Sequence, residues 1–121
     1  MYELTVSSGF SAAHNLREYE GRCERLHGHN YEVEASFTAD KLAENGLAVD
    51  FGVLKKALKK ALDELDHKYL NDDVGFFQKN NPSAENIAFF IHEMLKKNVK
   101  EAKVSKVSVW ESSGAKASYY E

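Results

Sequence analysis

The sequence contains a single cysteine, a single proline and no long apolar run. One cysteine, Cys23, excludes a disulfide framework within the chain. The longest uninterrupted apolar run, from Ile87 to Ile91, is far too short to span a bilayer. The first residues have neither the basic segment nor the apolar core of a secretory signal. We therefore expect a cytoplasmic protein with no membrane partner.

An excess of positive charge is also missing. The chain has 16 Lys and Arg against 19 Asp and Glu, a net charge of −3. Proteins that bind nucleic acid usually present a basic face, so this balance disfavours a nucleic-acid partner. The 121 residues, 43% of them hydrophobic, fit one globular domain that spans residues 1–121. This apolar content is too high for a disordered chain.

The spacing of apolar residues predicts strands near both ends of the chain. Apolar and polar residues alternate over 2–7 and again over 29–38, which is the period of strands with one buried face. Residues 14–28 are polar and aperiodic and predict a long loop, and loops of that length are usually functional or mobile. Valines at 104, 107 and 109, and the segment 117–120, predict two further strands.

Two helices are predicted between these pairs of strands. Apolar residues recur at helical spacing from Leu54 to Leu65, with Asp50 as a plausible N-cap. Pro82-Ser83 opens the second helix, with Ser83 as its N-cap. The order β-β-α-α-β-β predicts an α+β domain, in which a four-stranded antiparallel sheet carries both helices on one face.

Three histidines form the first candidate site. His27 and His29 are two residues apart, so on a strand both imidazoles point the same way and can converge on one ion. Antiparallel pairing of the first two strands can bring His14 alongside. Three neutral imidazoles with one open position are the ligand set of a catalytic zinc site. An ordinary pair of surface or core histidines is the alternative, and spacing alone favours it.

Cys23 is the second feature. Arg22 and Arg25 flank it, and nearby cations lower the pKa of a thiol and favour the reactive thiolate. Two alternatives are a buried inert thiol and a fourth zinc ligand that closes a structural site. Spacing alone favours these two alternatives over a catalytic thiol.

Carboxylates define two more candidates. Asp66 precedes His67 at the predicted end of the first helix, and a carboxylate beside an imidazole can raise its basicity and assist proton transfer. Simple stabilisation of the helix terminus is the alternative. Glu111 shares the inward parity of its strand, where a carboxylate needs a partner. That partner is either a planar ligand with two adjacent N–H donors, such as a pterin or guanine edge, or a buried Lys or Arg. His92, in the middle of the second helix, is predicted to be a structural or surface residue.

Taken together, these motifs resemble the family of 6-pyruvoyltetrahydropterin and 6-carboxytetrahydropterin synthases. The resemblance covers nearly the whole chain in order. It is carried by Phe10-Ser11-Ala12-Ala13-His14, Cys23-Glu24-Arg25-Leu26-His27-Gly28-His29, Val49-Asp50-Phe51, Leu65-Asp66-His67, Asn81-Pro82-Ser83-Ala84-Glu85-Asn86 and Val109-Trp110-Glu111. The Cys-x3-His-Gly-His spacing resembles the bacterial and archaeal 6-carboxytetrahydropterin synthases of queuosine biosynthesis. A departure is Ala84, where the family often has a second hydroxyl residue.

The resemblance implies a role for each candidate residue. Members of the family have the tunnelling fold, in which three subunits close a barrel and two barrels stack into a homohexamer with active sites between subunits. The implied zinc ligands are His14, His27 and His29. The implied catalytic residues are Cys23 as general base with Asp66 and His67 as its partners, and the implied substrate-binding residues are Glu111, Ser83 and Glu85.

The implied reaction is that of a zinc-dependent lyase. It converts 7,8-dihydroneopterin triphosphate to 6-carboxy-5,6,7,8-tetrahydropterin, acetaldehyde and triphosphate. Arg22, Arg25 and Lys116 are candidate cations for the triphosphate. The alternatives are a 6-pyruvoyltetrahydropterin synthase or a related side-chain lyase, and, outside enzymes, a zinc-stabilised binding module with Cys23 as the fourth ligand.

Overall fold

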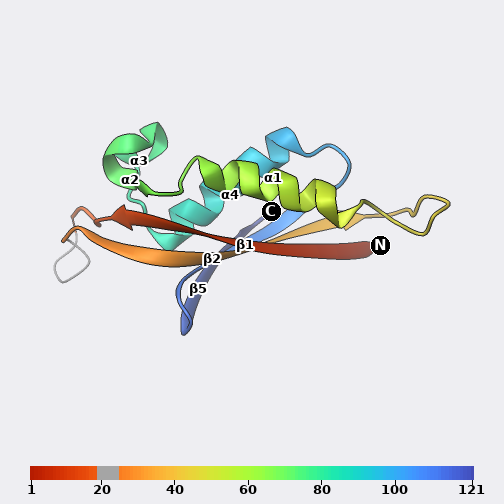
Figure 1. Ribbon diagram of the computed structural model, residues 1–121, viewed down its shortest axis with the longest axis horizontal. Coiled ribbons are helices and arrows are strands. Elements are labelled where there is room, and N and C mark those ends of the chain that lie inside the picture. Colours follow the sequence, from red (N-terminus) through yellow and green to blue (C-terminus); the bar gives the residue numbers. More distant parts are fainter. Residues whose placement is uncertain (19–24) are drawn as a thin grey trace.

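A single sheet carries the helices of this chain on one face, as Figure 1 shows for the computed structural model, which describes residues 1–18 and 25–121. The order of strands in the sheet is β3-β1-β2-β4-β5. The strands are β1 (Tyr2–His14), β2 (His27–Ala39), β3 (Lys68–Tyr69), β4 (Lys103–Ser112) and β5 (Ala115–Tyr120). The helices are α1 (Phe51–Asp63), α2 (Leu70–Asp73), α3 (Gly75–Lys79) and α4 (Ala84–Asn98).

The core lies between the sheet and the two long helices. Alternate residues of β2 are almost completely buried, as the alternation in the sequence predicts. The faces of α1 and α4 that contact the sheet are apolar, and burial of each large aliphatic side chain contributes roughly 1.5–3 kcal/mol. The buried side chains of this core include Tyr31, Val33, Phe37, Leu54, Leu58, Leu62, Ile87, Ile91 and Leu95.

Both predicted N-caps are confirmed. The Asp50 carboxylate accepts a hydrogen bond from Gly52 N at 2.7 Å, and the Ser83 hydroxyl accepts one from Asn86 N at 3.1 Å. Each side chain thus satisfies a backbone donor that has no partner within the first turn of its helix. The helices within the described ranges are too short or too polar to span a bilayer.

The prediction of a four-stranded antiparallel sheet is wrong in one respect, because a fifth strand makes the sheet mixed. β3 pairs with β1 in parallel, through Ala12 and Ala13. A strand of two residues has no periodicity that a sequence can reveal. The expected pair of helices is likewise accompanied by the short α2 and α3, which follow β3 directly.

The first helix also ends earlier than predicted. α1 stops at Asp63, so Asp66 and His67 lie in the turn that follows it. In this turn His67 has a φ of 59°, in the left-handed region that few residues other than glycine adopt. The turn is held by β1: Ser11 N donates to the Asp66 carboxylate at 2.9 Å, and His67 N donates to Ser11 O at 2.6 Å. These two bonds set β3 beside β1.

Candidate metal centre

The three histidines meet where β1 ends and β2 begins. His14 is the last residue of β1 and pairs with His27, the first residue of β2, while His29 pairs with Ala12. All three side chains project toward the helices, and their ring centroids lie 4.6–5.1 Å apart. One nitrogen of each ring lies within 4.8 Å of the other two. This group can therefore hold a metal ion.

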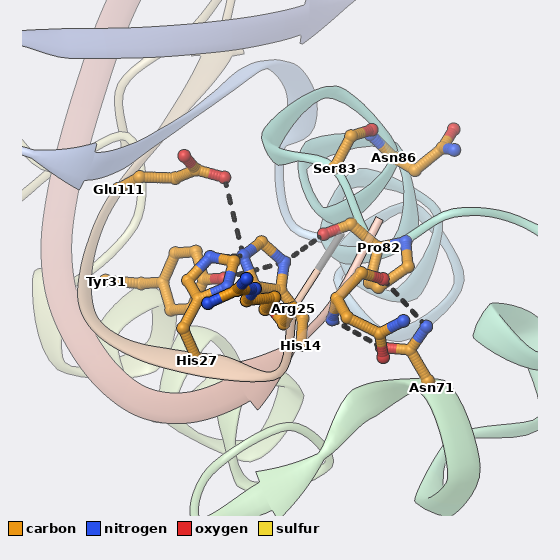
Figure 2. Close-up of polar contacts among 10 residues, drawn as sticks. His14, Arg25, His27, Tyr31, Asn71, Pro82, Ser83, Asn86 and Glu111 are labelled. Carbon is orange, nitrogen blue, oxygen red and sulfur yellow. Dashed lines mark hydrogen bonds and ion pairs between the residues drawn. The ribbon is translucent and has the colours of Figure 1, made fainter. Parts of the chain in front are cut away.

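Backbone carbonyls fix which ring nitrogens are bare. His14 Nδ1 is 2.6 Å from Pro82 O, and His27 Nδ1 is 2.6 Å from Arg25 O. A carbonyl oxygen only accepts, so each Nδ1 carries the proton and each neutral ring has a bare Nε2. Figure 2 shows the Pro82 carbonyl pointing at His14 from the side of α4.

The two bare nitrogens face each other. His14 Nε2 and His27 Nε2 are 3.0 Å apart, and two lone pairs at that distance repel unless a cation or a proton lies between them. His29 Nε2 is buried without any hydrogen-bond partner. Two bare imidazole nitrogens and an unpartnered third, from three rings whose ligand atoms lie within 4.8 Å of one another, form a donor set that zinc and similar metals bind. Hydrogen bonds from Nδ1 to carbonyls, as in His14 and His27, are the usual support for such ligands.

Burial adds to this preference for a metal. His14 is only 1% exposed, and this burial lowers the pKa of its ring, although the Pro82 carbonyl and the Glu111 carboxylate act in the opposite direction. The neutral ring, which is the form that binds metals, is thus favoured. The Tyr31 hydroxyl lies 3.2 Å from His14 Nδ1, and burial raises the pKa of this phenol.

A cavity with a carboxylate at its edge adjoins the histidines. Glu111 Oε1 lies 4.0 Å from His14 Nε2, and Figure 2 shows the carboxylate directed at the ring pair. The cavity has a volume of about 290 Å³ and is bounded by Glu111, the start of α4 with Ser83 and Glu85, and Lys116 of β5. The fold thus gathers the residues expected to bind substrate beside the expected metal ligands.

Asp66 and His67 lie in a different part of the fold from the three histidines. Side chains alternate along a strand, so Ser11, Gly28 and Asn30 face away from the three histidines. These residues line one groove together with His67, whose ring is 83% exposed, and His29 also borders this groove. His67 Nδ1 is 3.0 Å from Asp66 Oδ1, and the hydrogen bond from Ser11 N is the main cause that lowers the pKa of the Asp66 carboxyl. Within one chain, Asp66 and His67 are thus not among the described residues whose ligand atoms converge with those of the three histidines, and His67 borders the groove on the opposite face of the sheet.

Asparagine side chains support the loops around this site, a role that the sequence did not predict although Asn81 and Asn86 lie in the motif 81–86. The Asn81 amide accepts from Arg17 N at 2.9 Å and donates to Arg17 O at 2.8 Å, and Asn71 contacts both backbone groups of Asn15 in the same way. Asn86 Nδ2 donates to Asn81 O at 2.8 Å, next to the Pro82 carbonyl that binds His14. Tyr31 was identifiable, because it has the strand parity of His27 and His29; the asparagine contacts depend on loop geometry that has no period.

The predicted general base cannot be placed. Cys23 and the neighbouring Arg22 lie outside the described residues. Arg25 is described and exposed, and its carbonyl supports His27.

The fold is that of a known class of pterin enzymes. The family model of 6-pyruvoyl tetrahydropterin synthase matches residues 3–121, so the chain belongs to this enzyme family. The structure of the 6-pyruvoyl tetrahydropterin synthase of Caenorhabditis elegans is similar, with a TM-score of 0.91 and 28% identity over 99% of this chain and 95% of that one. This similarity confirms the α+β fold of the family.

Within the family, the chain is similar to proteins named 6-carboxy-5,6,7,8-tetrahydropterin synthase. It is 31% identical to the one from Aquifex aeolicus, over all of this chain and 90% of that protein. It is 38% identical to the one from Synechocystis sp., over 78% of this chain and 75% of that protein. The resemblance stated from the sequence motifs is thereby confirmed.

The opposite placement of His27 and His67 leads to a test of the metal centre. We expect His27→Ala to lose most of the zinc that the unaltered protein retains after dialysis against metal-free buffer, because one of three bare nitrogens is removed. His67→Ala is the matched control: it removes an imidazole from the far face and should retain zinc. Elemental analysis of both dialysed variants measures this, and equal zinc contents would contradict the assignment.

Proposed function

We propose that this chain is a zinc-dependent lyase that converts 7,8-dihydroneopterin triphosphate and water to 6-carboxy-5,6,7,8-tetrahydropterin, acetaldehyde and triphosphate, a step of queuosine and other 7-deazapurine biosynthesis. The observation that carries the proposal is the 3.0 Å approach of two bare histidine nitrogens beside the cavity of Glu111. The names of the similar proteins support the substrate class.

In this proposal His14, His27 and His29 would hold the zinc. Bound zinc would supply Lewis acidity toward oxygens of the substrate side chain. Pro82 and Arg25 keep the Nδ1 protons of His14 and His27 on the side away from the ion, so the ligand nitrogens stay bare throughout the reaction.

Glu111 would orient the pterin. Its carboxylate can accept two parallel hydrogen bonds from adjacent N–H groups of the ring edge, and such charge-assisted pairs are strong and directional. Ser83 and Glu85 line the same cavity and would contact the ring, while Lys116 would meet the negative charge of the triphosphate. Holding the ring here brings the side chain toward the histidines, so binding energy is used for orientation.

Cys23 would act as the general base. As a thiolate it would accept a proton from the substrate side chain, and the Asp66–His67 pair would return that proton. Because Asp66 and His67 face the far side of their own sheet, we propose that a neighbouring subunit supplies this pair.

The direct test of the reaction is the identity of the product. We expect purified zinc-loaded protein to convert 7,8-dihydroneopterin triphosphate to a pterin that keeps one side-chain carbon, with release of acetaldehyde. Mass spectrometry of the pterin and an assay for acetaldehyde measure both halves. The C. elegans neighbour favours a second candidate, 6-pyruvoyltetrahydropterin synthase, whose product would retain all three side-chain carbons. Detection of that product alone would replace the first assignment.

The role of the thiol is tested by Cys23→Ala. If Cys23 is a base outside the zinc coordination shell, the variant should retain zinc and its melting temperature while turnover falls by about 10²–10⁴-fold. Zinc content, thermal unfolding and product formation are measured on the same preparation. A variant that is poor in metal and destabilised would show instead that Cys23 is a fourth ligand of a structural site.

The assembly follows from the edges of the sheet. β5 has a neighbour on one side only, and β1 is paired with β3 only at Ala12 and Ala13. Open edges favour pairing with further strands, and closure into a barrel removes them. We propose a homohexamer formed by two trimeric rings, with the Asp66–His67 pair of one subunit facing the histidine cluster of another.

Shared sites make a complementation test possible. His27→Ala and His67→Ala should each be inactive alone, but subunits mixed by joint refolding should recover activity, with about a quarter of sites combining an intact cluster and an intact pair. A mixture of His14→Ala and His27→Ala is the control and should recover nothing, because both lack the same cluster. Hybrid assemblies without any gain in turnover would contradict sharing between subunits.

A further inference from the structure

His92 is a buried side chain without partners. It lies on α4 and is 0% exposed, and neither ring nitrogen has a hydrogen bond. Within residues 1–18 and 25–121, the other buried side-chain nitrogen or oxygen that lacks a partner is His29 Nε2, at the candidate metal centre. Because a buried polar group without a partner costs free energy, His92 requires an explanation.

Two carboxylates surround this imidazole. Glu93 follows His92 on α4, and Glu121 follows β5; one donor atom from each of the three residues lies within 4.8 Å of the others. Neither carboxylate is hydrogen-bonded to the His92 ring. The imidazole nitrogen and the carboxylate oxygens are therefore near one another without being in direct hydrogen-bond contact. The Tyr119 ring packs edge-on against His92, with centroids 4.9 Å apart, and closes one side of the group.

The charge of the group is only partly balanced. Lys96 Nζ lies 2.9 Å and 3.2 Å from the two oxygens of Glu121. Two carboxylates and one ammonium leave the group negative, with a buried imidazole nitrogen available as a donor. One imidazole nitrogen and two carboxylate oxygens are donors that zinc accepts, with bonds of about 2.0–2.2 Å.

We propose that His92, Glu93 and Glu121 form a second site for a divalent transition-metal ion such as zinc, separate from the cluster of His14, His27 and His29. The ion would satisfy the buried imidazole and connect α4 to the segment that follows β5. Lys96 competes for Glu121, so this site is weaker than the three-histidine cluster and fills only when zinc is added in excess. It does not depend on the proposed reaction.

The test uses the full chain with His27→Ala as background, in which the first cluster is disabled. Zinc titration followed by calorimetry should show about one zinc bound per subunit, and unaltered protein in excess zinc should bind a second equivalent. Glu121→Gln, which keeps the contact to Lys96 but removes a charged ligand, should weaken this zinc by about tenfold or more.

Lys96 competes with a bound metal ion for the Glu121 carboxylate, so variants of Lys96 and of its neighbour Lys97 form a matched pair. Lys96→Met should strengthen binding of the added zinc, because it frees the Glu121 carboxylate. Lys97→Met removes an equal charge from an exposed neighbour on α4 that is not bonded to Glu121, and it should leave the affinity unchanged. A single zinc per unaltered subunit in excess metal, or equal affinities with and without Glu121→Gln, would overturn the proposal.

Discussion

Two histidine nitrogens without protons, held 3.0 Å apart, are the constraint on which the rest of this structure depends. Each ring donates its Nδ1 proton in a hydrogen bond to a backbone carbonyl. His14 donates to Pro82 O, just before α4, and His27 donates to Arg25 O, just before β2. Neither ring can turn away without giving up that bond, and for His14 the lost bond would be in a buried place. The fold therefore keeps two lone pairs in a repulsive arrangement that a cation relieves.

The parts of the chain that produce this arrangement are far apart in sequence. Strand pairing sets His14 beside His27, and the segment before α4 brings Pro82 against His14. Asn86, in the first turn of α4, donates from its side-chain amide to Asn81 O and so holds that segment in place. The Ser83 hydroxyl is the N-cap of the helix and accepts from Asn86 N. The same short segment, 81–86, thus starts a helix, contacts the metal centre through Pro82 and borders the cavity of Glu111 through Ser83. A change in this segment affects both stability and the site.

Much of the fold was predictable because it rests on periodicity. The alternation in β2 predicted the buried face and the common direction of His27 and His29, and the N-caps Asp50 and Ser83 were identified from residue type alone. What escaped prediction depends on contacts between distant backbone groups. β3 exists because Asp66 and His67 bind Ser11, and the bare nitrogens follow from two carbonyls. The burial of His92 arises from β5 packing on α4, which spacing within the helix does not encode.

Asp66 and His67 were recognised as a motif from the sequence, but the face of the sheet on which they lie was not predictable from it. The sequence suggested that this pair assists a thiol near the metal, yet the turn after α1 directs it to the opposite face of the sheet. In the proposed mechanism, a single subunit then carries two parts of the active site, one on each face of its sheet. This arrangement is the reason for the proposal that the active site is shared between subunits, which needs no change in the fold of the chain.

X-ray absorption at the zinc edge, on protein loaded with one equivalent of zinc, tests the central claim most directly. Three bare imidazoles predict three nitrogen ligands at about 2.0–2.1 Å, with the multiple scattering of histidine rings and a further oxygen ligand, and no sulfur. A sulfur ligand at about 2.3 Å, or fewer than three histidine rings, would contradict a three-histidine centre that leaves Cys23 free to act as a base.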